Sequence, residues 1–439
     1  MSAFALDVLL RLERSRHPGS LARPAPALDL QPGPRPDLAI DLTGRAPHPG
    51  IPTLTIDFGG QCNLAAGLSQ TLASAELPNL VARLDGVAVA HARPMIGDRL
   101  WLSRAASDLL AGAVSLIELC VHRFAAGMLV PLSGDVPHIL QRSGRDVVLR
   151  YLPHLAMGLV QRRLRRSSRP FYWQVAWRQI EGPGVAETGR IDGRPFAVLP
   201  DDGRRFYADP FAFEWQGAQY LFVEEYEYGA GKGVISVARL DAGGTVETPR
   251  VVIAQPHHLS YPQVFARAGE VYMIPEASTA GELVLYRATS FPDRWVREAV
   301  LVEGRELNDM TLLERNGRLW LVGSERRGNG NASDTMVVYH ASALTGPWLP
   351  HGMNPILVDR SAARPGGAFV ERGGRVFLPV QDGTLAYGGG LGLAELLVLN
   401  EEDVRFGPVQ PIASGEAWDR AGIHTLNRAG RLEVIDSAG

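Results

Sequence analysis

An internal repeat in the second part of the chain constrains the fold more than any other feature. The segment Ala208–Phe213 resembles Ser260–Phe265, and each is followed by a glycine turn and by a second apolar run that ends in Glu224 or Glu276. Three further copies start near residues 309, 366 and 422. Repeats of about 50 residues, built from short strands and tight turns, are typical of propeller blades. A single blade leaves its faces uncovered, so the copies must pack on one another.

We therefore predict a mainly β fold, with a five-bladed β-propeller over residues 171–439. A strand around Phe196–Leu199 is predicted to join the last repeat and close the ring.

The first part of the chain has a different pattern. Residues 1–130 predict a small α/β domain, with a proline-rich loop over Pro18–Pro36. Residues 131–170 predict a helical bridge that ends in a basic run at 162–166. This run would suit a membrane surface or an acidic partner, but cations are also common at a solvated helix C-terminus. The predicted helices of residues 1–170 are Leu6–Leu12, Asn63–Ala75, Ala105–Phe124 and Val148–Leu164. The predicted strands of the same region are Leu38–Leu42, Thr53–Phe58, Leu80–Arg83 and Val87–Ala90.

Charge and cysteine content narrow the function classes. The net charge of −3 argues against a nucleic-acid partner. Two cysteines cannot form a disulfide framework, and charged residues interrupt the early apolar stretch where a signal peptide would lie. No uninterrupted apolar run is long enough to predict a membrane span. We expect a cytoplasmic protein.

The repeat places acidic residues at equivalent positions. The first strand of a blade is innermost, so Asp209, Tyr261 and Asp309 should ring one mouth of the channel in register. Carboxylates that crowd together must bind hydroxyls or cations or have shifted pKa values. Glycoside chemistry needs two such groups roughly 5 to 9.5 Å apart. The catalytic candidates are Asp209, Asp309 and Glu276. The alternative is that some of these acids cap backbone N–H groups in turns.

Other polar residues of the repeats are candidates for sugar binding, because they could bond hydroxyl groups. Arg364 could also clamp a phosphate or act as a counter-ion for the acids. No HExxH, CxxC or EF-hand pattern occurs, so no metal site and no cofactor are predicted. The substrate-binding candidates are Tyr261, His258, Glu224, Glu325, Arg364, Gln381, Asp382 and His424.

Several segments resemble the N-terminal propeller domain of glucosamine inositolphosphorylceramide transferases and its bacterial relatives. In the plant proteins a separate C-terminal domain carries the transfer chemistry, so the resemblance implies a five-bladed propeller rather than that activity. The segments that carry it are Tyr207–Phe211, His258–Pro262, Ile274–Ala277, Leu285–Ala288, Phe291–Trp295, Gly346–His351, Asn354–Pro355, Ala363–Gly367 and Gly422–Leu426.

The propeller is also distantly similar to the arabinanase, invertase and levansucrase group. That resemblance implies a base or nucleophile at Asp209 and a tuning role for Asp309. The acid of that group follows the second Asp in the chain, whereas Glu276 precedes Asp309 and Glu325 follows at closer spacing.

The N-terminal region faintly resembles a formyltransferase-like domain. The resemblance rests on Leu9–Glu13, Ile40–Gly44 and the strand to Phe58. Formyltransferases use an Asn, a His and an Asp, and His48 has no Asn two residues before it. The resemblance therefore implies a degenerate scaffold.

Three hypotheses for the function remain open at this point. The first is an enzyme that hydrolyses or transfers a glycosyl group through Asp209 and a glutamate. The second is a module that binds a glycan or glycolipid without turnover. The third is a scaffold that works with a separate glycosyltransferase.

Overall fold

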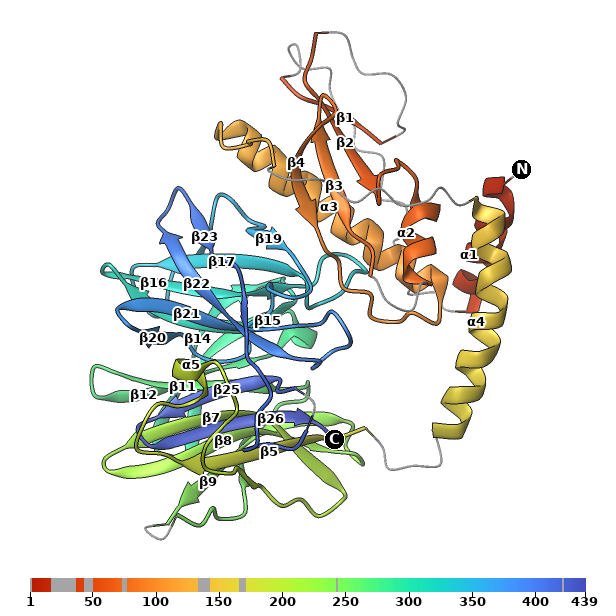
Figure 1. The fold of residues 1–439 in the computed structure, drawn as a ribbon. Coiled ribbons are helices and arrows are strands. Elements are labelled where there is room, and N and C mark those ends of the chain that lie inside the picture. Colours follow the sequence, from red (N-terminus) through yellow and green to blue (C-terminus); the bar gives the residue numbers. More distant parts are fainter. Residues whose placement is uncertain are drawn as a thin grey trace. The chain divides into compact units, whose positions relative to one another are not determined.

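The computed structural model describes residues 2–16, 37–42, 50–72, 77–132, 143–165, 171–241, 244–420 and 422–439. The chain divides into two compact units (Figure 1). The predicted loop Pro18–Pro36 lies outside the described residues, as do His48 and Arg166. Unit 1 comprises Met1–Pro170, Arg326–Thr335 and Met353–Asp359, and unit 2 comprises Phe171–Glu325, Met336–Gly352 and Arg360–Gly439.

Unit 1 contains a four-stranded sheet in the order β1-β2-β3-β4, with β1 parallel to β2 and the other pairs antiparallel. Asp85 and Gly86 connect β3 to β4, and both have positive φ, as a two-residue hairpin turn requires. Segments 326–335 and 353–359 come from far along the chain, and no sequence pattern indicates that they belong to this unit. The elements of unit 1 are α1 (Ser2–Arg16), β1 (Ala39–Asp41), β2 (Thr53–Phe58), α2 (Leu64–Thr71), β3 (Leu80–Leu84), β4 (Val87–Ala92), α3 (Leu102–Ala125), α4 (Gly144–Arg165) and β19 (Leu357–Val358).

Helix α3 forms the centre of the core of unit 1. Leu109, Leu116 and Cys120 on its inner side are fully buried. By length and composition alone α3 could cross a membrane, and no other helix among the described residues could. Since 61% of its most apolar window is buried, packing within the fold accounts for its apolar character.

The described residues of unit 2 form five antiparallel sheets, called I to V here. A short helix, α5 (Val185–Thr188), precedes sheet I. Sheet I holds β7 (Arg205–Trp215), β8 (Ala218–Glu227), β9 (Lys232–Leu240) and β10 (Arg250–Ile253). Sheet II holds β11 (Ser260–Arg267), β12 (Glu270–Glu276), β13 (Glu282–Ser290) and β14 (Arg294–Glu303). Sheet III holds β15 (Leu307–Arg315), β16 (Arg318–Glu325), β17 (Thr335–Ala341) and β18 (Leu349–Pro350). Sheet IV holds β20 (Val370–Arg372), β21 (Arg375–Gln381), β22 (Leu391–Leu399), β23 (Val404–Phe406) and β24 (Gln410–Pro411).

Sheet V combines strands from both ends of unit 2. Its order is β25 (Thr425–Ala429), β26 (Leu432–Ala438), β5 (Trp173–Gln179) and β6 (Ala197–Val198). The strand predicted around Phe196–Leu199 is present as β6, and it lies in the last sheet as expected. The larger contribution comes from β5, which pairs with β26 along its whole length. Strand β5 was not predicted, because it precedes the first repeat.

The first strands of sheets I, II and III share an irregularity. The pairing register shifts at residues 209–210 in β7, at 261–262 in β11 and at 309–310 in β15. Asp209, Tyr261 and Asp309 have φ values of 48°, 45° and 49°. Non-glycine residues rarely adopt this conformation, and a bulge of this kind re-aims the side chain. The strands β7, β11 and β15 are neighbours in space, so the three bulges bring these side chains together.

Candidate functional site

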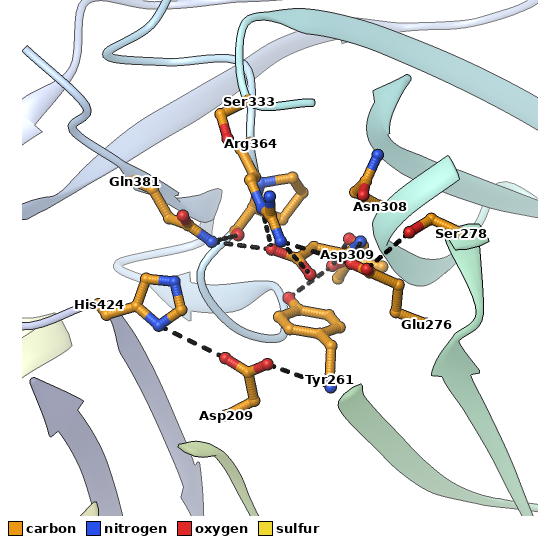
Figure 2. A network of polar contacts seen from close by, with 12 residues as sticks. Asp209, Tyr261, Glu276, Ser278, Asn308, Asp309, Ser333, Arg364, Gln381 and His424 are labelled. Carbon is orange, nitrogen blue, oxygen red and sulfur yellow. Dashed lines mark hydrogen bonds and ion pairs between the residues drawn. The ribbon is translucent and has the colours of Figure 1, made fainter. Parts of the chain in front are cut away.

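Polar residues from all five sheets of unit 2 meet at the bulges (Figure 2). We call the five buried acids among them the acidic centre. Each lies on the first or second strand of its sheet, which is why distant parts of the chain contribute. The acidic centre consists of Asp209, Glu224, Glu276, Asp309 and Asp436.

Carboxylates of the acidic centre bind the bulged backbone of the next sheet. The Asp209 amide of sheet I donates to Asp436 Oδ2 of sheet V at 2.9 Å. The Tyr261 amide of sheet II donates to Asp209 Oδ2 at 3.2 Å, and the Asp309 amide of sheet III donates to Glu276 Oε2 at 3.2 Å. The backbone N–H group of each bulge thus donates to an acid on the preceding sheet. These hydrogen bonds hold the strained backbone and the position of each sheet relative to the next.

Arg364 is the buried counter-ion of two of these acids. Its Nε donates to Asp309 Oδ2 at 2.6 Å, and one terminal nitrogen lies 3.4 Å from Glu276 Oε2. Gln381 Nε2 donates to Asp309 Oδ2 at 2.8 Å, and Ser278 Oγ donates to Glu276 Oε1 at 2.9 Å. Both oxygens of Asp309 and of Glu276 therefore accept hydrogen bonds within the protein.

Asp209 is bonded differently. Its Oδ2 accepts from the Tyr261 amide, whereas the buried Oδ1 has no hydrogen-bond partner among the described residues. His424 Nδ1 lies 3.4 Å from Asp209 Oδ1 and 3.3 Å from Asp436 Oδ2. Asp209 Oδ1 thus contacts His424 as an ion pair but accepts no hydrogen bond.

Asp209, His424 and Asp436 also form a group that could hold a metal ion. One possible ligand atom from each lies within 4.8 Å of the others. Motif spacing could not predict this group, because its members come from β7, from the segment before β25 and from β26.

Glu224 is paired with His258. The Gly233 amide donates to His258 Nδ1 at 2.8 Å, so that nitrogen must be unprotonated and the proton lies on Nε2. Nε2 is 3.4 Å from Glu224 Oε1. Burial lowers the pKa of His258, which agrees with a neutral ring that orients Glu224.

Burial and mutual repulsion perturb the acids of the centre. Burial raises the pKa of Asp209 to about 7, with His424 opposing the shift and Asp309 adding to it. Burial also raises the pKa of Asp309 to about 7 against the effect of Arg364. The pKa of Glu224 is raised well above its usual value by burial and by the charge of Asp209. Burial alone would lower the pKa of His424, but the charges of Asp436 and Asp209 outweigh it and raise that pKa. In turn, the contact with His424 lowers the pKa of Asp436, although burial of Asp436 acts in the opposite direction.

These shifts predict how stability depends on pH. Asp209 and Asp309 have pKa values of about 7 in the folded state, above the value of about 3.9 in the unfolded state. Between about pH 4 and about pH 7 the folded state therefore binds more protons than the unfolded state. Stability should therefore fall as pH rises from about 4 to about 7, and His424, whose pKa is also raised, acts in the same direction.

We expect a higher free energy of unfolding at about pH 5 than at about pH 8, as measured by urea titration. Asp209→Asn should flatten this dependence because the amide does not titrate. A wild-type protein more stable at the higher pH would contradict the raised pKa values of these carboxyls.

Aromatic side chains border the acidic centre. Trp173 stacks on His424 with ring centres 4.2 Å apart, and Tyr387 approaches the same ring edge-on at 5.1 Å. The residue Tyr387 is 42% exposed, and the guanidinium carbon of Arg364 lies 5.3 Å from the centre of its ring. An exposed ring beside buried polar groups suits a ligand with one apolar face and several hydroxyls, as a sugar has.

Three predicted site residues have other roles in the structure. Glu325 is bound by Arg305, and Asp382 accepts from the Thr384 amide in its own loop, as the turn-capping alternative expects. Tyr261 was predicted to bind substrate, but its ring is fully buried. Its hydroxyl contacts Thr311 Oγ1 at 2.8 Å and accepts from the Gly367 amide at 2.9 Å. The bulge turns the Tyr261 side chain into the core, and its predicted contact with a substrate stays a prediction.

Tyr261→Phe should reduce the free energy of unfolding by about 1–3 kcal/mol, because it leaves the buried Gly367 amide without an acceptor. Tyr272→Phe is the matched control, since Tyr272 is only half-buried and should change stability by less than about 0.5 kcal/mol. Urea titration of both variants measures the difference. Equal stability of the two would show that the Tyr261 hydroxyl contributes nothing.

Comparison with protein families identifies the family of a little more than half of the chain. The family model "Glucosamine inositolphosphorylceramide transferase 1, N-terminal" matches residues 200–433. The chain belongs to this family. The resemblance predicted from the sequence is therefore confirmed for the family, whereas its formyltransferase-like part lies outside the matched residues and stays a prediction.

Curated relatives in this glucosamine inositolphosphorylceramide transferase family come from plants. The chain is 34% identical to "Glucosamine inositolphosphorylceramide transferase 1" of Arabidopsis thaliana over 245 residues, which is 54% of this chain and 32% of the relative. It is 36% identical to the protein of the same name from Oryza sativa subsp. japonica over 208 residues, 46% of this chain and 28% of the relative. The match thus spans about a third or less of these relatives.

Solved structures that resemble this chain include a family 117 glycoside hydrolase and an α-L-arabinanase. Zg3597, a family 117 glycoside hydrolase of Zobellia galactanivorans, is 14% identical with a TM-score of 0.39, covering 55% of this chain and 76% of that one. The α-L-arabinanase of Cellvibrio cellulosa is 17% identical with a TM-score of 0.36, covering 47% and 78%. These values are too low to transfer site residues to this chain.

Proposed function

We propose that unit 2 is a five-bladed β-propeller that acts on the glycosidic bond of a glycoconjugate at the acidic centre. Five consecutive antiparallel sheets support this architecture, as does a last sheet made from both ends of the unit. Family membership supports a carbohydrate ligand, because the relatives' name refers to transfer involving glucosamine and inositolphosphorylceramide.

The observation that carries the proposal is the contrast between two buried carboxyl groups. Asp209 Oδ1 accepts no hydrogen bond and contacts His424 at 3.4 Å, whereas burial and the charge of Asp209 raise the pKa of Glu224 well above its usual value and so favour its protonated form. Glycosidic-bond cleavage needs one carboxylate as base or nucleophile and one carboxylic acid as proton donor. Asp209 takes the first role and Glu224 the second, with His258 orienting Glu224.

The other two catalytic candidates take supporting roles in this proposal. Glu276 and Asp309 accept hydrogen bonds from the protein at both oxygens, so both carboxylates are held in place by their neighbours. Together with Arg364 they fix the bulge of β15 and set the charge around Asp209. Tyr387 and His424 are the proposed sugar contacts.

A second candidate function is glycan or glycolipid binding without turnover, in support of a separate glycosyltransferase. The hydrogen bonds that Glu276 and Asp309 accept from the protein favour this candidate, because most of the acidic centre then stabilises the fold. A location in the cytoplasm, expected from the two free cysteines, belongs to the proposal as well.

The test is a screen of the purified chain against glycosides, nucleotide sugars and inositol-containing glycolipids, with turnover and binding measured separately. Turnover of a member of the panel supports the enzyme. Binding without turnover supports the second candidate. A chain that neither binds nor converts any of these classes contradicts both.

A further inference from the structure

Helix α4 has apolar side chains on two opposite faces. Val147 and Tyr151 are fully buried in the core of unit 1, as expected of an amphipathic helix. The opposite side, which we call the outer face, should be polar on a solvated helix. Its exposed residues are Leu149, Leu152, Met157, Leu159, Val160 and Leu164, with 45–69% of each side chain accessible.

These outer residues form one stripe. Leu149, Leu152, Val160 and Leu164 are separated by three, eight and four positions, spacings that return to the same side of a helix. A helix that is apolar all round has a partner on each face. Isolated exposed leucines are normal on a protein surface, but the six apolar residues of the outer face lie together on one side of α4.

Helix α1 repeats the pattern beside it. Leu6 and Leu10 enter the same core as α4, and the two helices pack against each other (Figure 1). Phe4, Val8 and Leu12 are exposed at four-residue intervals, with Phe4 73% accessible. Both helices therefore have a buried apolar face and an exposed apolar stripe.

The charges around these stripes are mostly positive, with Asp146 in the first turn of α4 and Asp98, which pairs with Arg162, as acidic neighbours. The chain as a whole has a net charge of −3, yet residues 147–170 contain no Asp or Glu. On α1, Asp7 pairs with Arg11 and Glu13 is buried, so neither offers a free negative charge. The arginines of the two segments are Arg11, Arg14, Arg16, Arg150, Arg162, Arg163, Arg165, Arg166 and Arg169.

We propose that the outer face of α4, together with the exposed stripe of α1, docks on an anionic membrane surface. Apolar side chains flanked by arginines are what a helix needs to lie in the headgroup region, with aliphatic groups entering the acyl boundary and guanidinium groups binding lipid phosphates. An acidic protein would complement the arginines but not so long an apolar stripe. This inference does not depend on the proposed function.

The experiment is co-sedimentation of the full chain with vesicles of phosphatidylcholine, with and without phosphatidylglycerol. We expect binding only to the anionic vesicles, weakened by salt. Arg150 and Arg163 are exposed, and Arg150→Gln/Arg163→Gln should weaken binding roughly 25-fold, about fivefold for each charge. Leu152→Gln/Val160→Gln/Leu164→Gln should weaken it at least about tenfold, because the headgroup region no longer buries those side chains.

Leu397→Gln is the matched control, because Leu397 is 56% exposed on β22 of unit 2 and should leave binding unchanged. Glutamine is a good helix former, so circular dichroism should show α4 intact in the triple variant. Absence of binding to anionic vesicles overturns the proposal, as does equal binding by the triple variant and wild type. A dimer in solution that the triple variant dissociates would assign the outer face to a second copy instead of a membrane.

Discussion

Arg364→Met is expected to reduce the free energy of unfolding by about 3–5 kcal/mol, the usual cost of leaving buried charges without their partner. Arg364 is buried, and it binds Asp309 at 2.6 Å and Glu276 at 3.4 Å. Methionine fills a similar volume but provides no charge, so both carboxylates would lose their cation. Urea titration at neutral pH measures the effect.

A pH series separates this cause from simple loss of packing. Without Arg364 the pKa of Asp309 should rise further, because the guanidinium now opposes the effect of burial. Protonation would then remove the uncompensated charge, so the variant should lose less stability at about pH 5 than at about pH 8. A pH-independent loss would mean that Arg364 acts through packing alone.

Arg375→Met is the matched control. Arg375 pairs with Glu395 at 3.0 Å, but its side chain is 57% exposed. Exposed pairs contribute less than about 1 kcal/mol, so this variant should stay close to wild type. If the two variants were equally stable, the buried ion pair of Arg364 would have no special importance.

Asp209→Asn is expected to lower kcat/KM for the glycoside found in the screen by about a thousandfold, within the range for loss of a catalytic acid or base. The fold should persist, since the amide oxygen can still accept from the Tyr261 amide. Substrate binding should also persist, because Asn retains the size and most of the polarity of Asp. Steady-state kinetics and a binding titration on the same preparation measure both properties. Asp293→Asn, at an exposed acid of sheet II, should keep wild-type rates.

Glu224→Gln tests the other half of the pair. A general acid matters for a poor leaving group and little for an activated aryl group that departs without a proton. The variant should therefore lose at least about a hundredfold with the natural type of leaving group and much less with a nitrophenyl glycoside. Equal losses on both substrates would remove Glu224 from the acid role, and wild-type rates in Asp209→Asn would remove Asp209 from catalysis.

The repeat accounts for what could be predicted of the site. Asp209 and Asp309 were placed together because equivalent positions of neighbouring units lie side by side, and the bulges have that effect in the structure. Asp436 could have been found by the same logic. It lies opposite Thr425 at the end of a second strand, as Glu224 lies opposite Ala208 and Glu276 opposite Ser260.

Other features could not be read from the repeat. Trp173 precedes the first unit, so only the pairing of β5 with β26 brings it to His424. Tyr387 lies between β21 and β22, where the units differ in length. The burial of Tyr261 depends on the left-handed conformation at the bulge, which nothing in a Ser-Tyr-Pro sequence indicates. Local pattern thus predicts which positions meet, but the direction of each side chain is decided by tertiary packing.

The pairing of β5 with β26 has a consequence for synthesis. A ribosome delivers β5 before any strand of sheets I to IV, yet its neighbour β26 emerges after all of them. Throughout that interval one edge of β5 can pair with β6, but the edge that β26 occupies in the finished fold has nothing to pair with. The pairing of β26 with β5 therefore completes the fold of unit 2. Because the acidic centre needs Asp436 from β26, it is assembled only when that strand pairs.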